Sequence, residues 1–453
     1  MLHLGWAVQD ITPSRPAMLH GQMHRRIASK AIDRLLVTAL AIEGGDPTDC
    51  AILVSCDLCL VPDELQRAVR DRLAARSLGI PLDRVFLAAT HTHTSLVLTP
   101  GEYEYPGGEV MAPEECLALV ADRAADAAEQ AWTGRTPHRY ASAFAQAVVG
   151  HNRRAVYADG SAEMYGRTDR EDFMAIEGYE DHSLDLLFWW DADGRLDGVT
   201  LGVPCPSQVD ENLEAFSADY WDDVRSELRA RWGKGLQVLP LCGAAGDVSP
   251  HFIVYGKQEE EMRRRRGVSE RREIAQRIAE GVARALACTK PVEGEIAFRH
   301  AVRRLELPPR QVTKEERDRA AAEYPRMAGQ YGAESWWARG LQDTIERFDG
   351  SKQSDDPVVI EIHVLRIGEV VLATNPFELY SDFGMRIKAR SPAAQTVIVQ
   401  LAAGCGWYLP TEQAVCRGGY GAIPPSSKVG PEGGRQLVEE TLATVERLFS
   451  VRP

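Results

Sequence analysis

Short apolar runs that alternate with longer helical segments are the feature of this sequence that most constrains its fold. Apolar runs of strand length occur at residues 36–42, 51–54, 85–89, 184–190, 199–203, 236–241, 358–367, 369–374 and 396–401. Helical spacing of apolar residues occurs at 64–77, about 113–132, 258–287 and 436–449. This alternation predicts an α/β fold, a large domain with mixed β-sheets flanked by helices.

The segment 310–350 differs from its surroundings because it is polar and helix-prone. It also carries the pair Trp336-Trp337. We expect a helical insertion or lid within a single domain that spans residues 1–453. Neither a repeat nor a low-complexity linker marks a second domain in the sequence.

Composition restricts the partners of the chain. The net charge of −14 argues against a broad electrostatic surface for nucleic acid or anionic membranes. No run approaches the roughly 20 apolar residues of a membrane span, and the N-terminus lacks a signal-peptide pattern. Nine cysteines, mostly in apolar contexts, favour a reducing compartment. The expectation is a cytoplasmic protein with a small-molecule substrate; a homo-oligomer is left open.

The pair His91-x-His93 directly follows the apolar run 85–89. Imidazole is a common metal ligand and a common general acid or base near neutral pH. Two histidines one residue apart after a strand can bring both rings near one point. Taken alone, however, the pair is better explained as two hydrogen-bonded loop residues.

Further loops after apolar runs carry reactive side chains. These are Asp247 and Ser249, Glu378, Tyr408 and Tyr420, and Arg153. A serine in a glycine loop is a nucleophile when a base or metal activates it, and a carboxylate or phenol can bind a metal. Each also has a plainer explanation: turn capping for Asp247 and Ser249, a helix-start carboxylate for Glu378, core packing for the tyrosines and a solvated cation for Arg153.

The order of these motifs is more specific than any one of them. It resembles the neutral/alkaline non-lysosomal ceramidase family, zinc-dependent amidases that cleave the N-acyl bond of ceramide. The resembling segments are Gly5–Pro13, Leu19–Gly21, Asp57-Leu58, Ala89–His93, Asn152–Arg154, Ser217–Tyr220, Gly246–Pro250, and Tyr408–Thr411 with Tyr420. The resemblance covers essentially the whole chain and implies the fold of that catalytic domain.

The resemblance also implies roles for individual residues. His91, Glu378 and Tyr408 are expected to bind Zn²⁺, and His93 to be a hydrogen-bonding or acid/base partner. Ser249, with Asp247 in the same loop, is the expected reactive serine; Tyr420 is an oxyanion donor and Arg153 a substrate contact. Such a centre lets zinc polarise a carbonyl or activate water. Whether Ser249 or water attacks stays open.

Four departures separate the chain from this family. Cys205, in Pro204-Cys205-Pro206-Ser207, stands where the family has its second zinc histidine. A thiolate is a good zinc ligand, so we expect Cys205 to bind the metal; the alternative is a lost ligand. The other departures are Ala244, Ser95-Leu-Val-Leu and Gly421. Together they disfavour ceramide itself more than they disfavour hydrolysis.

The leading hypothesis is therefore a zinc-dependent hydrolase that cleaves an N-acyl amide of a small or soluble substrate. A second hypothesis is an enzyme of the same fold that cleaves an ester or glycosidic bond of a polar, carbohydrate-derived substrate. Trp336 and Trp337 would then form an aromatic wall for the substrate. A third is a non-catalytic binding protein with a degenerate metal site, for which Cys205 is the motivating residue.

Overall fold

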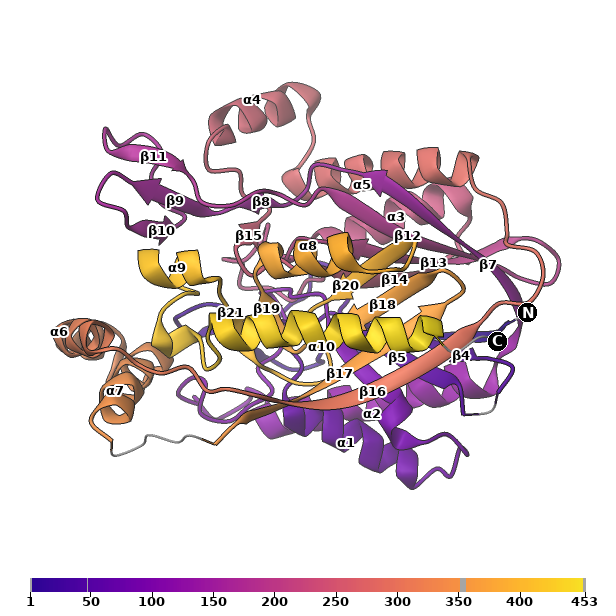
Figure 1. Cartoon of the computed structure of the whole chain (residues 1–453), viewed down its shortest axis with the longest axis horizontal. Coiled ribbons are helices and arrows are strands. Elements are labelled where there is room, and N and C mark those ends of the chain that lie inside the picture. Colours follow the sequence, from indigo (N-terminus) through magenta and orange to yellow (C-terminus); the bar gives the residue numbers. More distant parts are fainter. Residues whose placement is uncertain (1, 47, 351–355, 451–453) are drawn as a thin grey trace.

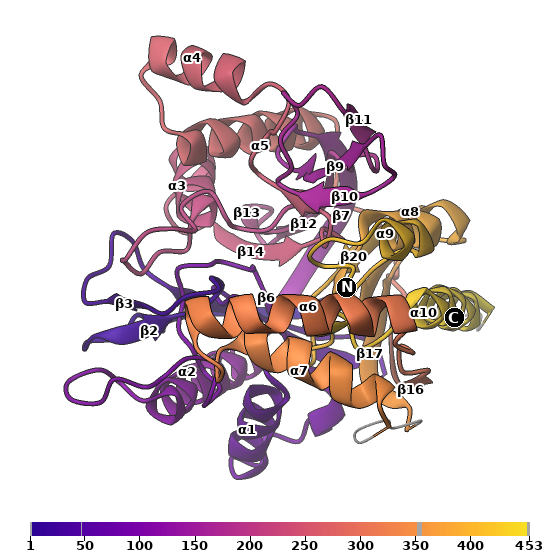
Figure 2. The same cartoon turned by 90° about the vertical axis from the view of Figure 1, so that its left-hand side faces the viewer.

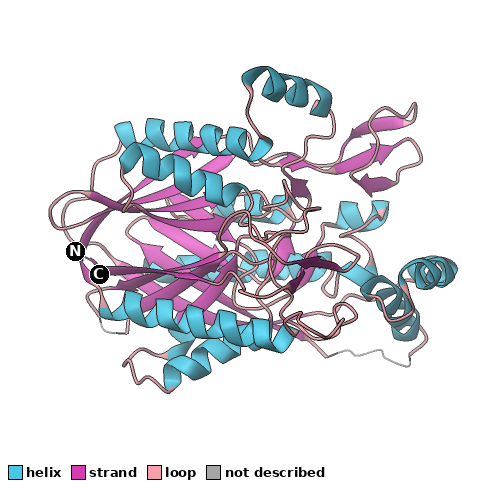
Figure 3. Cartoon of the chain, turned by 180° about the vertical axis from the view of Figure 1, so that it is seen from behind, coloured by secondary structure: helices cyan, strands magenta, loops and turns pink. Residues whose placement is uncertain are grey.

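Two stacked β-sheets form the centre of the molecule, and helices cover both outer sides (Figures 1 and 3). The computed structural model describes residues 2–46, 48–350 and 356–450. Within these ranges the larger sheet has eight strands and the smaller has four. Both sheets contain parallel as well as antiparallel pairs. The predicted α/β fold with mixed sheets flanked by helices is confirmed.

The strand order of the larger sheet brings distant segments side by side. In spatial order its strands are β14 (Gln237–Cys242), β13 (Leu196–Val203), β12 (Ser183–Trp190), β7 (Thr136–Gln146), β1 (Leu2–Asp10), β4 (Leu36–Glu43), β5 (Cys50–Cys56) and β6 (Val85–Ala89). The smaller sheet has the order β16 (Phe298–Leu307), β17 (Val358–Ile367), β18 (Val370–Thr374) and β20 (Gln395–Val399).

Short strands build the loops at one end of these sheets. They are β2 (Ala17–Leu19), β3 (Arg26–Ala28), β8 (His151–Asn152), β9 (Arg154–Tyr157), β10 (Ala162–Met164), β11 (Phe173–Ile176), β15 (Val248–Ser249), β19 (Phe377–Leu379) and β21 (Trp407–Leu409). The helices are α1 (Asp63–Ala74), α2 (Pro113–Thr133), α3 (Tyr220–Trp232), α4 (Gly256–Arg266), α5 (Glu270–Ala287), α6 (Lys314–Tyr331), α7 (Trp336–Phe348), α8 (Ser381–Arg390), α9 (Glu412–Arg417) and α10 (Pro431–Ser450), with 3₁₀ turns η1 (Leu82–Arg84) and η2 (Pro424–Ser426).

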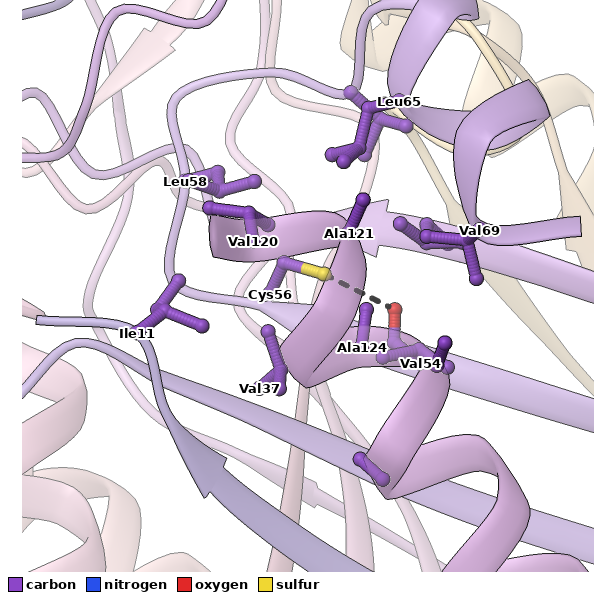
Figure 4. Close-up of a cluster of buried hydrophobic side chains, with 14 of the residues drawn as sticks. Ile11, Val37, Val54, Cys56, Leu58, Leu65, Val69, Val120, Ala121 and Ala124 are labelled. Atoms are coloured by element: carbon purple, nitrogen blue, oxygen red, sulfur yellow. Dashed lines mark hydrogen bonds between the residues drawn. The ribbon is translucent and has the colours of Figure 1, made fainter. Parts of the chain in front are cut away.

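The alternation of side chains along the strands explains the layers. In β4, Val37 and Ala39 face α1 and α2, whereas Leu40 and Ile42 face the smaller sheet. Successive strand residues point to opposite faces, so the side chains of one apolar strand can pack into two hydrophobic cores, one on each face of the sheet. Figure 4 shows the helix-side cluster, in which Val37 lies near Ala124 of α2. Full burial of each valine or leucine contributes about 1.5–3 kcal/mol.

Two further cores complete the outer layers. Helices α3 and α5 cover β12 and β13, and α8 and α10 cover the smaller sheet. Helix α10 begins at Pro431, earlier than the predicted start at 436, and it includes Gly433 and Gly434. A Cβ on Gly434 would overlap the ring of Phe383, so the glycine lets α10 approach α8 closely.

Three long strands lie outside the segments predicted from sequence, namely β1, β7 and β16. Their sequences mix charged and apolar residues, so they lack the apolar run that marks a buried strand. The charges are accommodated by ion pairs; Arg299 of β16, for example, contacts Asp49 at 2.8 Å. Sheet pairing therefore overrides weak local patterning in these strands.

The segment 310–350, for which the sequence predicts a helical insertion or lid, contains the helices α6 and α7. The two helices pack on each other at the end of the molecule opposite the termini, and α7 also contacts η2 (Figures 1 and 2). Arg339 of α7 donates a hydrogen bond to the carbonyl of Gly101, which ties the insertion to a loop after β6. In the described part of the chain, the helices are all too short or too polar to span a bilayer.

A buried chain of polar side chains joins the smaller sheet to α1. His300 Nε2 lies 3.0 Å from His363 Nδ1, and His363 Nε2 lies 3.0 Å from the Glu361 carboxylate. Arg70 of α1 binds the same carboxylate at 2.6 Å. Burial alone would raise the pKa of Glu361, but the hydrogen bonds from His363 and Arg70 lower it to about 2.

Replacing Glu361 with glutamine is expected to lower the free energy of unfolding by about 2 kcal/mol at pH 7. The folded-state pKa lies below the ordinary value of 4.5, so the stabilisation is present above pH 4.5 and disappears as the pH falls towards 2. Urea unfolding at pH 7 and pH 3 measures this, with the exposed Glu369→Gln as control. An equal deficit at both pH values would contradict the expectation.

Candidate active site

The loop that follows β6 holds His91 in an unusual backbone conformation. Its φ is +64°, a left-handed value that is costly for a residue other than glycine. Strands β5 and β6 are parallel, so the segments that leave them run side by side. The Thr90 N–H donates to the Cys56 carbonyl at 2.9 Å. His91 Nδ1 donates to the Cys59 carbonyl at 2.6 Å, which orients the buried ring.

Two short parallel strands present the expected oxygen ligands. Strand β19 pairs with β21 so that Glu378 lies directly beside Tyr408. The Glu378 carboxylate lies 3.3 Å from His91 Nε2. Three of the four metal ligands expected from the sequence therefore lie at one place, although they come from loops almost 320 residues apart.

These residues line a cavity of about 60 Å³. Among its lining residues are six of the eleven candidates named from the sequence: His91, His93, Trp336, Glu378, Tyr408 and Tyr420. Burial raises the pKa of the Tyr408 and Tyr420 phenols above the usual range, so both stay protonated and can donate hydrogen bonds.

Aromatic rings form one wall of the cavity. Trp336, the first residue of α7, stacks on Trp407 with the ring centroids 5.6 Å apart. Trp336 also contacts Tyr420 in a T-shaped arrangement, with the ring centroids 6.1 Å apart. Trp337 contacts Tyr420 from a second, adjoining pocket and does not line the cavity itself. The helical insertion thus contributes a side chain to the candidate site.

Arg153 lies behind the cavity wall. Its guanidinium donates to the Tyr408 hydroxyl at 3.1 Å and to the Tyr165 hydroxyl at 3.2 Å. Tyr165 in turn donates to Ser249 Oγ at 3.0 Å. Ser249 is fully buried and does not line the cavity, and among the described residues its side-chain oxygen contacts neither an imidazole nor a carboxylate.

Asp247 holds loops together in this structure. Its carboxylate accepts hydrogen bonds from the Asn152 amide at 2.9 Å and from the Ser381 N–H at 2.8 Å. The Ser381 hydroxyl contributes a third, at 2.9 Å. These contacts join β8, β15 and the start of α8, and the side chain does not line the cavity.

Cys205 does not line the cavity that the other three expected ligands share. It is fully buried in the core beneath α3, and its thiol contacts the carbonyl of Pro206 at 3.4 Å. Burial and the neighbouring Cys242 raise the pKa of the Cys205 thiol well above its usual value. The side chain is not among those that line the cavity.

A different cysteine, Cys59, lines the cavity. Its Sγ lies 3.8 Å from His91 Nδ1. Burial alone would raise the pKa of this thiol, but the imidazoles of His20, His91 and His93 outweigh that effect and lower the pKa well below its usual value. From the sequence alone, Cys59 is only one of nine cysteines, most of them in apolar contexts. The signal that would have found it is its position just after β5, next to β6.

His93 completes this group. Its Nε2 accepts a hydrogen bond from the Gln208 amide at 2.6 Å, whereas its Nδ1 has no hydrogen-bond partner although the ring is buried. One atom each from Cys59, His91 and His93 lie within 4.8 Å of one another. A thiol and two imidazoles are donors that Zn²⁺ accepts, so these side chains fit the expected metal.

Comparison with solved structures identifies proteins of similar fold. The chain is similar to the neutral ceramidase from Pseudomonas aeruginosa, with a TM-score of 0.71 and 19% identity, over 98% of this chain and 75% of that one. It is equally similar to a structure described as ceramidase complexed with C2, at 18% identity and the same coverage. No protein-family model matches the sequence, and no curated protein matches it either. At this identity the similarity establishes a ceramidase-like fold.

Proposed function

We propose that the chain is a zinc-dependent hydrolase that cleaves an N-acyl amide bond of a small or soluble substrate. The observation that carries this proposal is the buried His91 ring at the base of the cavity. The Glu378 carboxylate lies 3.3 Å from His91 Nε2, and Tyr408 is paired with Glu378 across two strands. Cys59 Sγ lies near the other ring nitrogen, Nδ1. The ceramidase-like fold supports hydrolysis as the reaction class, by analogy.

Zinc at His91 would supply Lewis acidity toward the substrate carbonyl. The protein's own side chains would position that carbonyl. Tyr420, with its phenol protonated and facing the cavity, donates a hydrogen bond to the developing oxyanion. Arg153 donates to the Tyr408 hydroxyl, and the Tyr408 ring packs against the Tyr420 ring with the centroids 5.4 Å apart, so Arg153 helps to position both phenols.

We assign the attack on the carbonyl to water and give Ser249 a structural part. Ser249 lies off the cavity, behind Tyr165, and has no base against its hydroxyl among the described residues. A serine nucleophile needs an adjacent base or a metal. The volume of the cavity, about 60 Å³, is well below the roughly 300 Å³ of ordinary ligand pockets. This favours a small reacting group over a long acyl chain.

One observation favours a second candidate, a hydrolase for a carbohydrate-derived substrate. The stacked Trp336 and Trp407 rings at the cavity offer flat faces of the kind that pack against sugar rings. In this alternative the bond cleaved is an ester or a glycosidic bond, and the metal site is the same.

The test is turnover by the zinc-loaded chain on matched panels of N-acyl amides, esters and glycosides. We expect the highest kcat/KM on a short-chain amide, loss of turnover after chelation, and recovery when zinc is restored. Preference for glycosides would replace the leading function with the second. A folded chain that binds no zinc and turns over no panel member would leave only the non-catalytic binding protein.

A further inference from the structure

We propose that Cys59 supplies a thiolate ligand to the metal, with His91 and His93 as the two nitrogen ligands. The thiolate expected at Cys205 thus comes from a different loop. This inference concerns the same cavity as the proposed hydrolase, but it does not require that the substrate be an amide. It predicts a sulfur-containing metal centre in this chain.

The distances are close to those of a metal site. In a tetrahedral zinc site, with Zn–S near 2.3 Å and Zn–N near 2.0–2.1 Å, neighbouring donor atoms lie about 3.3–3.6 Å apart. Cys59 Sγ and His91 Nδ1 lie 3.8 Å apart. The three donors, one from each residue, all lie within 4.8 Å of one another. Side-chain movements of about 1 Å would therefore complete the site.

The loops that carry the donors are tied to each other. The Cys59 N–H donates to Ser95 Oγ at 3.0 Å, and that hydroxyl donates to the Thr92 carbonyl at 3.1 Å. On the other side of His91, the Thr90 N–H donates to the Cys56 carbonyl at 2.9 Å, so the segments after β5 and β6 are joined both before and after His91. A site on such fixed backbone needs little reorganisation on metal binding.

His93 provides an independent indication of a missing partner. The residue is only 9% exposed, yet its Nδ1 makes no hydrogen bond. Its Nε2 lies 2.6 Å from the Gln208 amide nitrogen, so metal binding at Nδ1 requires the ring proton to move to Nε2 and the Gln208 side chain to turn its oxygen toward that nitrogen. The Glu211 carboxylate lies 3.5 Å from Nδ1, close enough to balance part of the metal's charge. Nδ1 therefore has an ion-pair contact but no hydrogen bond, and a buried nitrogen without a hydrogen bond is stabilised when a ligand satisfies it.

In this arrangement Glu378 holds His91 from the other side. A metal at Nδ1 would replace the hydrogen bond that this nitrogen donates to the Cys59 carbonyl, and the ring proton would then lie on Nε2. The Nε2–H is then directed at Glu378, 3.3 Å away. A carboxylate on the second nitrogen of a metal-bound histidine is a common way to fix the ring. Sulfur and imidazole donors also select Zn²⁺ or Co²⁺ over Mg²⁺ and Ca²⁺.

The experiment is a titration of the metal-stripped chain with Co²⁺, which reports thiolate ligation as a charge-transfer band in the near ultraviolet. We expect one cobalt per chain and a clear thiolate band. Cys59→Ser should remove the band and weaken zinc binding by at least about 100-fold. Cys205→Ser, a matched change of another buried cysteine, should leave band and affinity unchanged.

A stoichiometric cobalt complex without the band would overturn the inference, as would a band that survives in Cys59→Ser. Loss of the band in Cys205→Ser alone would return the thiolate to Cys205. If Cys59→Ser does not fold, alkylation of the wild-type chain decides: zinc must protect Cys59, mapped by mass spectrometry, and equal labelling with and without zinc refutes the proposal. A thiolate band without turnover on any panel member would refute the proposed hydrolase and leave this inference intact.

Discussion

Replacing His91 with glycine is expected to abolish stoichiometric zinc binding and to lower kcat/KM by at least about a thousand-fold. That loss corresponds to roughly 4 kcal/mol of transition-state stabilisation. Glycine is chosen because φ at this position is +64°. Glycine adopts this conformation without the cost that a side chain pays, so the imidazole is removed while the backbone is relieved.

His91→Ala removes the same ring but keeps the strained backbone. It should therefore match the glycine variant in zinc content and turnover, yet unfold at a lower denaturant concentration. His138→Ala is the control for a buried histidine away from the cavity, where the ring bonds to Asp197 at 2.9 Å. Zinc content, turnover and urea unfolding are measured on all three. Retention of zinc and turnover by His91→Gly would remove His91 from the site.

The second large effect is expected at a buried ion pair beneath the candidate site. Arg225 of α3 binds both carboxylate oxygens of Asp57, each at 2.9 Å, and both side chains are almost completely buried. Asp57 also accepts the Leu36 N–H at 2.9 Å. Arg225→Met should lower the free energy of unfolding by about 3–5 kcal/mol, because it leaves an unpaired buried carboxylate.

A double-mutant cycle separates the free-energy cost of an unpaired Asp57 carboxylate from the net contribution of the Asp57–Arg225 ion pair to stability. Asp57→Asn with Arg225→Met removes both charges, so it should recover most of the stability that Arg225→Met loses. Since Asp57 lies two residues before Cys59, Arg225→Met should also weaken zinc binding, whereas the double variant restores it. Urea unfolding and zinc titration measure both effects. A loss below about 1 kcal/mol in Arg225→Met would show that water reaches the Asp57 carboxylate.

Much of the framework follows from local sequence patterns. The runs at 36–42 and 85–89 are strands, and the segments predicted at 64–77 and 113–132 form α1, which ends at Ala74, and α2, because their apolar spacing matches one period clearly. The long strands β1, β7 and β16 were not predicted, because pairing with neighbouring strands stabilises sequences that carry no such signal.

The sequence likewise predicted part of the candidate site and missed part of it. His91, Glu378 and Tyr408 each follow or lie in a short strand, and these three of the four residues predicted as ligands line one cavity, whereas Cys205 does not. Their roles as zinc ligands stay predictions, as does that of Cys205. The sequence drew attention to Cys205 by alignment with a motif, and passed over Cys59, which has no motif of its own.

The sequence by itself determined the α/β framework and the residue types available for chemistry, because periodicity and composition are local properties. Only the tertiary structure decided which cysteine faces the cavity, that Trp336 reaches it from the helical insertion, and that Ser249 lies behind Tyr165. Those outcomes depend on long-range strand pairing and on the path of loops such as the one that holds His91 at positive φ. A displacement of a loop by a few ångströms is enough to place a different cysteine thiol at the cavity. Local sequence patterns do not contain that information.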